Sequence, residues 1–390
     1  MKKIVYFDNA ATTPVREEVL NEMLPYFTED YGNASSVYSL SKKSKRAILK
    51  ARERVANLIG AEPSEIIFTS GGTESDNFAI KGVADALKEK GKHIITTSIE
   101  HHAILNSCKN LEEKGFEITY MPVDEYGMID VSELENAIRS DTILISVMFA
   151  NNEIGTIEPI KEIGEIARKK GIYFHTDAVQ AAGHAKIDVN EMCIDLLSVS
   201  GHKLGAQKGI GALYVRKGVR LKRAMDGGSQ EGGMRAGTEN VPAIVGLGKA
   251  AELSETELDS EEKRLSIMRD KLIKSILESI PFSRLNGHPE KRLPGNCNIS
   301  FEYIDGSSLV AALDTFDICA SSASACSSAS HEPSHVLTAI KSEGGSLRFS
   351  LGHGNTDEEI DYVISVLPRI VQGLRNMSPV YEDYLKNKEL

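Results

Sequence analysis

The sequence contains no tryptophan and no apolar run long enough to cross a membrane. A helix that spans a bilayer needs about 20 mostly apolar residues in succession, so we expect a protein that does not span a membrane. The first residues include two lysines but lack the apolar stretch of a secretory signal peptide. These absences together predict a cytoplasmic location.

Cysteine is scarce, and its five copies are widely spaced. No two of them form a CxxC pair and their number is odd, so neither a disulfide framework nor a structural zinc site is expected. This pattern is typical of a protein from a reducing compartment, in which at least one thiol is free. The cysteines are Cys108, Cys193, Cys297, Cys319 and Cys326.

An excess of basic residues is also missing. Lys and Arg number 45 against 56 Asp and Glu, which gives a net charge of −11 and a pI near 5.5. Such an acidic chain is not expected to take nucleic acid or an anionic membrane as its main partner. Its 390 residues, of which 41% are hydrophobic, can bury a large core and form more than one structural unit.

What is present is a regular alternation of strands and helices from residue 65 to residue 215. Near-continuous apolar runs alternate with amphipathic stretches, a pattern that indicates a mostly parallel sheet with helices on both faces. We therefore predict an α/β fold of the doubly wound type. The expected strands are 65–69, 93–97, 142–149, 172–176, 195–200 and 211–215.

The pattern changes after a long helix expected over 243–280, which Pro281 ends. Shorter strands and helices follow, and Thr356 with Glu359 predicts a capping box at the start of the last long helix. These elements predict a second, smaller α+β unit. We place the large domain at 16–256 and the small domain at 1–15 and 257–390, the latter carrying a loop at about 321–332.

In an open α/β sheet, ligands bind beyond the carboxyl ends of the strands, and five expected strands end in polar or glycine-rich clusters. In the first cluster, Gly72 and Thr73 open a helix. The glycines and free N–H groups there fit a phosphate, although an ordinary turn with Thr73 as the helix cap has the same sequence. The P-loop spacing is absent, which disfavours a nucleotide triphosphatase.

The other clusters carry titratable side chains. Of the adjacent His101 and His102, only one is expected to face a site, and a structural role is common for a lone histidine. Asp177 and Gln180 follow another strand, where they could cap a helix or hold the nitrogen and the oxygen of a ring. Lys203 follows a buried strand; most lysines are simply exposed, but a desolvated one at this edge could act as an amine nucleophile.

No single cluster decides between these alternatives. Together they supply a phosphate cradle, a carboxylate for a ring nitrogen, amides for a ring hydroxyl and a nucleophilic lysine. Pyridoxal phosphate requires this set, because its electron-sink chemistry needs a protonated ring nitrogen held by an acid. The combination therefore predicts pyridoxal phosphate as the cofactor.

With these motifs in place, the chain resembles the NifS/IscS-type cysteine desulfurases of the fold-type I aminotransferase superfamily. The resemblance runs through nearly the whole chain. It implies a mostly parallel, seven-stranded cofactor-binding sheet, a homodimer, and an enzyme that moves sulfur from L-cysteine to an iron–sulfur scaffold or a tRNA-thiolation enzyme, leaving L-alanine. The motifs are YFDNAATTP, GNASS, FTSGGTESDN, EHHAI, NNEIGT, HTDAVQ, SGHK, RAGTEN, SSASACSSAS and LRFSLG.

The resemblance also implies a role for each matching residue. Lys203 would bind the cofactor covalently, and His101 would stack on its ring and move protons. Arg348 would hold the substrate carboxylate, to which a guanidinium fork is suited, and Thr238 would reach the cofactor phosphate of the partner subunit. The ring nitrogen would pair with Asp177, the ring hydroxyl would contact Gln180 and Asn152, and the phosphate would contact Gly72, Thr73, Ser200 and His202.

Cys326 stands in the serine- and alanine-rich stretch 321–330, a composition typical of an exposed loop. A thiolate there could attack the substrate sulfur and then present it elsewhere as a persulfide, which is the catalytic role that the resemblance implies. Cys319, on an expected strand, is predicted to be a core residue.

Two departures from the family pattern bear on the subgroup, and therefore on the acceptor. Residues 204–207 read Leu-Gly-Ala-Gln where many members carry an aromatic residue, His, Gly and Pro, and Gly232 replaces a common arginine. A selenocysteine lyase or another fold-type I enzyme is the main alternative, although an aminotransferase needs no Cys326. A non-catalytic iron–sulfur scaffold is disfavoured, because the cysteines are not closely spaced.

Overall fold

The computed structural model describes residues 4–322 and 334–388. At its centre lies a seven-stranded sheet with the strand order β2-β8-β7-β6-β5-β3-β4. Neighbouring strands are parallel except for β8, which runs antiparallel to both β2 and β7. The predicted α/β fold with a mostly parallel sheet is therefore confirmed. The strands are β2 (Ile66–Thr69), β3 (His93–Thr97), β4 (Glu117–Met121), β5 (Thr142–Ser146), β6 (Tyr173–Asp177), β7 (Leu196–Ser200) and β8 (Gly211–Val215).

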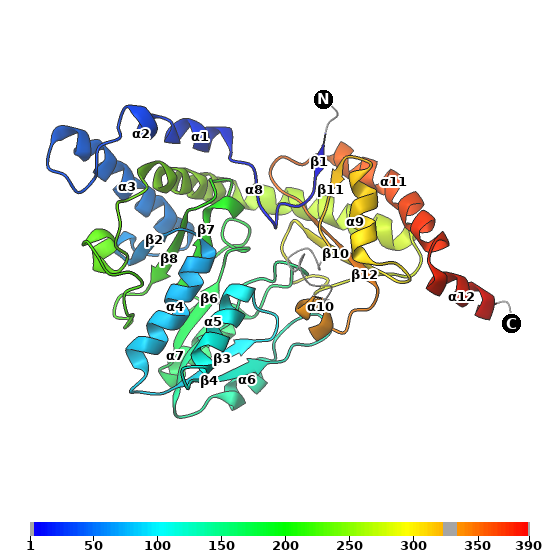
Figure 1. Cartoon of the computed structure of the whole chain (residues 1–390), viewed down its shortest axis with the longest axis horizontal. Helices are drawn as coiled ribbons and strands as arrows, with labels where there is room; N and C mark the ends of the chain where they lie inside the picture. The colour runs from blue at the N-terminus through cyan, green and yellow to red at the C-terminus, as the bar shows by residue number, and fades with distance from the viewer. Residues whose placement is uncertain (1–3, 323–333, 389–390) are drawn as a thin grey trace.

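Helices cover both faces of this sheet (Figure 1). On β2, Ile66 and Phe68 pack in one buried cluster with α1, α3, α7 and the first half of α8, while Ile67 packs in another with α4 and α5. Burial on both faces explains the near-continuous apolar runs of the inner strands. The helices are α1 (Glu17–Met23), α2 (Pro25–Thr28), α3 (Ser39–Leu58), α4 (Gly72–Leu87), α5 (His102–Glu112), α6 (Val131–Ala137), α7 (Ile160–Lys170) and α8 (Val241–Ser279).

A smaller unit lies beside the large sheet, built on an antiparallel sheet of order β12-β10-β9 and on a parallel pair of β1 with β11. Its core cluster includes the second half of α8, so this helix runs through both units. The buried residues of α8 stop at Ala251 and resume at Leu265; the domain boundary at 256/257 lies between them and stays a prediction. The elements are β1 (Val5–Tyr6), β9 (Ser283–Leu285), β10 (Asn296–Phe301), α9 (Gly306–Asp314), β11 (Ile318–Cys319), α10 (His335–Ala339), β12 (Gly345–Ser350), α11 (Asp357–Asn376) and α12 (Pro379–Lys388).

Strand β4, at the edge of the large sheet, has no counterpart among the strands expected from the sequence. It pairs with β3 alone, and Glu117 at its start is exposed. An edge strand with an open side needs no continuous apolar run, so its sequence EITYM lacks the pattern that marks the inner strands. The helix expected over 243–280 is observed as α8, and the capping box of Thr356 and Glu359 is also present.

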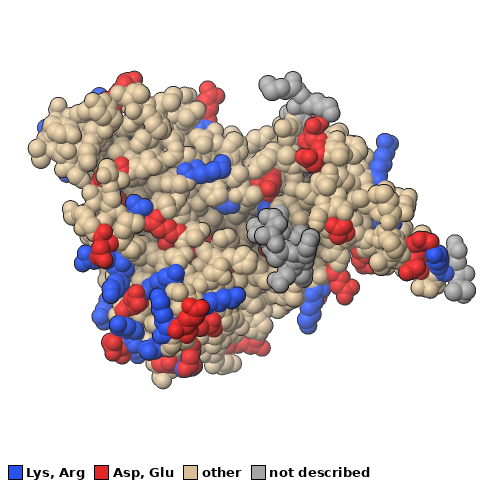
Figure 2. Space-filling view, in the orientation of Figure 1, with Lys and Arg blue, Asp and Glu red and all other residues tan. Residues whose placement is uncertain are grey.

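The surface shown in Figure 2 carries charges of both signs. Over α4, α5 and α6, the Lys and Arg side chains lie among Asp and Glu rather than in a patch of one sign. Exposed pairs of this kind add at most about 1 kcal/mol each to stability, so the fold depends mainly on its buried clusters. None of the described helices combines the length and the apolar run that a bilayer crossing requires.

Glu158, which is buried beside the large sheet, should make the stability of the fold depend on pH. One carboxylate oxygen accepts a hydrogen bond from the Ile129 N–H at 3.0 Å, and burial raises the pKa of Glu158 to about 8. The folded chain then holds a proton that the unfolded chain releases above its ordinary pKa. This contribution to stability is complete at acidic pH and is lost as the pH rises through about 8.

We therefore expect Glu158→Gln, which cannot ionise, to gain stability relative to the native chain as the pH rises from about 5 to about 8, by on the order of a few kcal/mol. Urea denaturation at the two pH values measures this difference. Glu162→Gln, at an exposed position of α7, is the matched control. A difference between native chain and Glu158→Gln that does not change with pH would contradict the prediction.

Candidate active site

One cavity of about 320 Å³ lies beyond the carboxyl ends of the strands of the large sheet. Its lining comes from segments far apart in the sequence and includes every predicted site residue except two. Thr238 is exposed and does not line the cavity, and Cys326 lies outside the described residues. The predicted residues in the lining are Gly72, Thr73, His101, Asn152, Asp177, Gln180, Ser200, His202, Lys203 and Arg348.

The first turn of α4 forms one end of the cavity. The helix begins at Gly72 with Gly71 as its cap, one residue before the expected Thr73. A Cβ atom on Gly72 would lie only 2.6 Å from Val179 Cγ2, so the close packing of this helix start requires glycine. The N–H groups of a first helical turn are free of intrahelical partners, and together with the helix dipole they suit an anion such as a phosphate.

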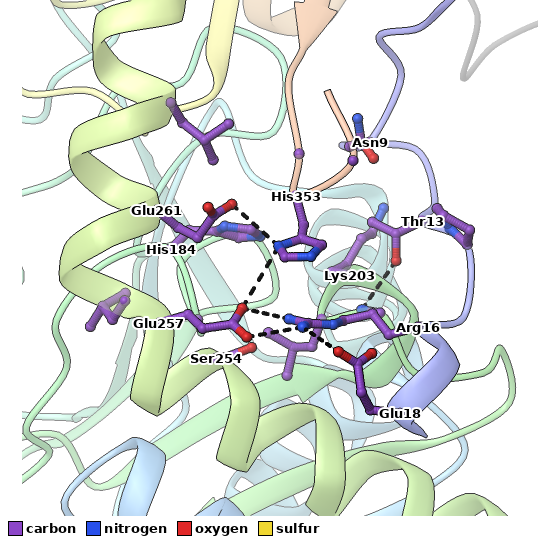
Figure 3. Close-up of a pocket in the computed structure, with 18 of the residues that line it drawn as sticks. Asn9, Thr13, Arg16, Glu18, His184, Lys203, Ser254, Glu257, Glu261 and His353 are labelled. Carbon is purple, nitrogen blue, oxygen red and sulfur yellow. Dashed lines mark hydrogen bonds and ion pairs between the residues drawn. The ribbon is translucent and has the colours of Figure 1, made fainter. Parts of the chain in front are cut away.

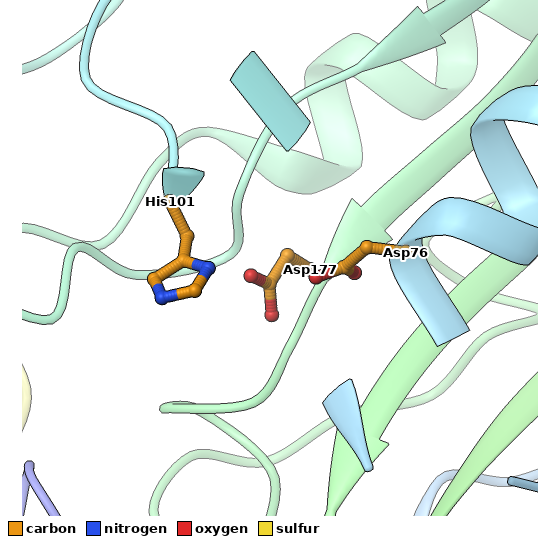
Figure 4. A group of neighbouring side chains, drawn as sticks. All are labelled: Asp76, His101 and Asp177. Atoms are coloured by element: carbon orange, nitrogen blue, oxygen red, sulfur yellow. The ribbon is translucent and has the colours of Figure 1, made fainter. Parts of the chain in front are cut away.

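A buried carboxylate forms the floor of the cavity. Asp177 ends β6, is 6% exposed and accepts a hydrogen bond from the Val179 N–H at 2.9 Å. Burial raises the pKa of Asp177, while His101 and Lys203 act in the opposite direction. His101 faces Asp177 across the cavity (Figure 4). A cation brought to this floor would compensate the buried charge, so the floor favours a protonated ring nitrogen.

The amine of Lys203 lies just beyond the end of β7. Its Nζ donates to the carbonyl oxygens of Ala10 and Ala11, the second at 2.7 Å. Gln180 Nε2 donates to the same Ala10 carbonyl at 3.0 Å. These bonds hold the N-terminal segment against the cavity. Burial and the charge of Lys203 lower the pKa of His202 to about 4, so this ring is neutral and can donate or accept one hydrogen bond.

Strand β12 brings a buried guanidinium to the cavity from the smaller unit. Arg348 is 4% exposed; its Nη2 pairs with Asp8 Oδ1 at 2.9 Å and its Nη1 donates to the Asn152 carbonyl at 2.9 Å. Among the described residues, Nε has no hydrogen-bond partner. The guanidinium is thus held in place with a donor to spare, which suits a carboxylate ligand.

Known proteins of similar sequence identify the family. A protein from Methanosarcina thermophila named cysteine desulfurase IscS is 61% identical over 97% of this chain and 94% of its own length. One of the same name from Clostridium botulinum is 56% identical over the full length of both chains. The profile of the aminotransferase class-V family matches residues 5–363. The chain belongs to the class-V aminotransferases, among the NifS/IscS-type cysteine desulfurases.

Solved structures of this family agree with the fold. A NifS-like protein that is 39% identical superposes with a TM-score of 0.90 over 95% of this chain and all of its own. A structure described as SspA in complex with cysteine is 40% identical, with a TM-score of 0.80 over 89% of this chain and 98% of its own. At 39% and 40% identity these likenesses agree with the family given by the sequence relatives.

The class-V aminotransferases of this type depend on pyridoxal phosphate, and the cavity fits that cofactor. Asp177 suits the ring nitrogen, the first turn of α4 suits the phosphate, and Lys203 provides the amine. The floor also holds a buried acceptor, Oδ1 of Asp76, that has no hydrogen-bond partner among the described residues. The donors and acceptors of the cavity therefore match the cofactor on chemical grounds as well as by family.

Asp8 and Asp76 are the residues of this desulfurase site that sequence reasoning missed. Each stands inside a motif that carried the resemblance, YFDNAATTP and FTSGGTESDN. A single aspartate forms no spaced motif that could identify it as a site residue. Asp8 joins the site only because the fold brings it to Arg348. Asp76 had a usable signal: it follows Gly72 by four residues, which places both on one face of α4.

A second cavity of about 340 Å³ lies behind Lys203, where the N-terminal segment, α8 and the residues after β12 meet (Figure 3). Arg16 pairs there with Glu257 through two contacts of 2.6 and 2.9 Å. His353 Nδ1 lies 3.7 Å from Glu257 and 3.6 Å from Glu261. Of the predicted site residues that the structure describes, only Lys203 lines this cavity, so it is distinct from the candidate active site.

Proposed function

We propose that the chain converts L-cysteine to L-alanine and passes the sulfur, as a persulfide on Cys326, to an acceptor protein. The observation that carries this proposal is the single cavity in which a buried carboxylate, a lysine amine, a helix N-terminus and a guanidinium converge from distant segments. The names of the relatives support it, as does the related structure in complex with cysteine. The acceptor would be an iron–sulfur scaffold or a tRNA-thiolation enzyme.

Each polar group of the cavity has a separate role in the proposed reaction. Bound pyridoxal phosphate supplies an electron sink for the substrate bond that breaks. Asp177 stabilises positive charge on the ring nitrogen, and Arg348 orients the substrate through its carboxylate. Lys203 provides the amine that binds the cofactor and exchanges protons at the substrate Cα. Partial desolvation lowers the pKa of His101, so its ring is ready to accept a proton beside the cofactor ring.

The four described cysteines are poorly placed to receive the sulfur, and none of them lines the cavity. Burial raises the pKa of Cys108 and Cys297 to about 12, so their thiolates are scarce at neutral pH. Cys319 is half-buried on β11 and not the fully buried core residue expected, because β11 pairs only with β1 at the edge of its unit; burial still raises its pKa. Cys326 is therefore the proposed nucleophile.

We also propose that the chain acts as a cytoplasmic homodimer in which Thr238 reaches the cofactor phosphate of the partner subunit. In one chain Thr238 is exposed and outside the cavity, as this role requires. The segment before it is anchored by Glu231, which pairs with Arg52 through contacts of 2.7 and 2.8 Å. Gly232 has a φ of +64°, which favours glycine, so the departure from the family's arginine has a local reason.

The test of the proposed function is the visible spectrum of the purified chain, followed by addition of L-cysteine under reducing conditions. We expect the absorption band of bound pyridoxal phosphate, a change in that band with cysteine, and alanine and sulfide in equal amounts. A colourless chain that stays inert with added pyridoxal phosphate would overturn the proposal. The same assay with selenocysteine distinguishes a desulfurase from a selenocysteine lyase.

Arg348→Lys should raise the KM for cysteine by roughly tenfold to a hundredfold, with a smaller change in kcat. Lysine keeps the positive charge but cannot offer the parallel N–H pair of a guanidinium, nor can it hold both Asp8 and a substrate carboxylate. Steady-state kinetics measures the two constants. Arg284→Lys, at an exposed position of β9, is the control, and an unchanged KM in Arg348→Lys would remove Arg348 from the substrate site.

A further inference from the structure

The floor of the active-site cavity holds a second carboxyl group that the proposed mechanism does not use. Asp76 lies on α4, is 1% exposed and lines the cavity. One oxygen of Asp76, one of Asp177 and one ring nitrogen of His101 lie within 4.8 Å of one another. Figure 4 shows Asp76 beside Asp177, on the side away from His101. The proposed mechanism thus leaves one buried acid whose oxygen lies within 4.8 Å of an oxygen of Asp177.

No positive charge compensates Asp76 from the side of the sheet. Its Oδ1 lies 3.8 Å from Nε2 of His175 and has no hydrogen-bond partner among the described residues. Burial lowers the pKa of His175 to about 3, so that ring is neutral. The remaining titratable groups that face Asp76 are Asp177, Glu100 and His101, and the first two are acids.

Two carboxylates so close together in a buried site cannot both carry a charge. Asp177 faces the cavity and His101, where it would pair with the nitrogen of the cofactor ring, whereas Asp76 faces the neutral His175 and Ser198. The negative charge is therefore more stable on Asp177. Burial and the charge of Asp177 raise the pKa of Asp76 and outweigh a hydrogen bond from Ser198 that lowers it, which agrees with this division.

We propose that Asp76 is a positioning residue that stays a neutral carboxylic acid, provides an O–H donor beside Asp177, and leaves the negative charge of the described cavity floor on Asp177. This inference rests on the role of Asp177 in the proposed function. A neutral acid can donate a hydrogen bond, which a carboxylate cannot. A donor within 4.8 Å of the Asp177 oxygen stabilises the negative charge of Asp177, which would then be available for the ring nitrogen.

Asp76→Asn and Asp76→Leu separate this role from that of a charged residue. Asparagine is neutral and keeps a donor, so its affinity for pyridoxal phosphate should stay within about twofold of the native chain, with the same pH response of the visible band. Leucine has no donor; the loss of one hydrogen bond to a charged group should weaken the affinity roughly tenfold and shift the pH response. Equal losses in both variants would show a charged Asp76, and no loss in either would show no positioning role.

Infrared difference spectroscopy of the apoprotein tests the neutral state directly. The C=O stretch of a protonated carboxyl group should be present at neutral pH and should disappear in Asp76→Asn. Its absence from the difference spectrum would overturn the proposal even where Asp76→Leu fails to fold. Thermal unfolding of each variant is the structural control, because a merely structural role would lower the Tm without moving the pH response of the visible band.

Asp177→Asn tests the role of Asp177 separately from the protonation state of Asp76. It should lose most of its affinity for pyridoxal phosphate, since an amide cannot compensate a protonated ring nitrogen. If Asp177→Asn binds the cofactor as the native chain does, the proposed role of Asp177 fails. The infrared result on the apoprotein does not depend on that role and still reports the protonation state of Asp76.

Discussion

Lys203→Ala should lower the turnover of cysteine by at least about a thousandfold, in the upper range for loss of one acid–base group. Among the described residues that line the cavity, Lys203 alone carries a primary amine, and the guanidinium of Arg348 does not give up its proton at neutral pH. Lys203 is thus the amine available for bond formation and proton exchange. Alanine formed from cysteine, in single-turnover and steady-state assays, measures the loss.

Two further variants show whether the amine or only its charge matters. Lys203→Arg keeps the positive charge and can still donate to the carbonyl oxygens of Ala10 and Ala11, so it should be nearly as inactive as alanine. Lys208→Ala, at an exposed position five residues further on, should turn over normally. Substantial activity in Lys203→Arg would mean that Lys203 acts as a charge, and the proposed chemistry would have to be revised.

The site residues at the strand ends were predictable because ligands of an open α/β sheet bind beyond the carboxyl ends of its strands. Asp177 ends β6, and Lys203 follows β7 within a few residues. Parallel neighbouring strands bring their carboxyl ends to the same edge, so apolar runs followed by polar residues already predict a shared site. The alternation of strands and helices therefore predicted which edge of the sheet holds the site. Missing β4 did not change this prediction, because β4 is the edge strand farthest from β7 on that side of the sheet.

The contribution of the smaller unit had no such local signal. Arg348 lies on β12 in the sheet of the smaller unit, where the N-terminal segment bridges to the same strand at Ser350 and brings Asp8 to the guanidinium. No hydrophobic period encodes the packing of two units, so the family resemblance alone suggested Arg348. Thr238 is a further case, because a role in a partner subunit cannot be read from the pattern or the structure of one chain.

The burial of Cys319 was not predicted correctly from its position on an expected strand. Cys319 was expected in the core because it stands on a strand, but a strand of two residues at the edge of a small sheet leaves it half-buried. Strand assignment indicates direction and spacing, while burial depends on what covers the strand. The choice of nucleophile among the thiols therefore needs an experiment on each of them.

Cys326→Ala should keep the visible band of pyridoxal phosphate and still change it on addition of cysteine, yet lower sulfide release by at least about a hundredfold. The cofactor groups at Lys203 and Asp177 are untouched by this change, so substrate binding survives. The sulfur lacks an acceptor thiolate, because none of the four described cysteines lines the cavity and burial also raises the pKa of Cys108 and Cys297 to about 12. Sulfide and alanine assays beside the spectrum measure the separation of binding from transfer.

Cys193→Ala provides the control, since Cys193 is a described thiol that is incompletely buried and does not line the cavity. Its turnover should equal that of the native chain. Mass spectrometry after exposure to cysteine should find one added sulfur atom in the native chain and in Cys193→Ala, and none in Cys326→Ala. Full turnover by Cys326→Ala would instead mean that no persulfide forms on Cys326. The chain would then act as a lyase that releases sulfur directly.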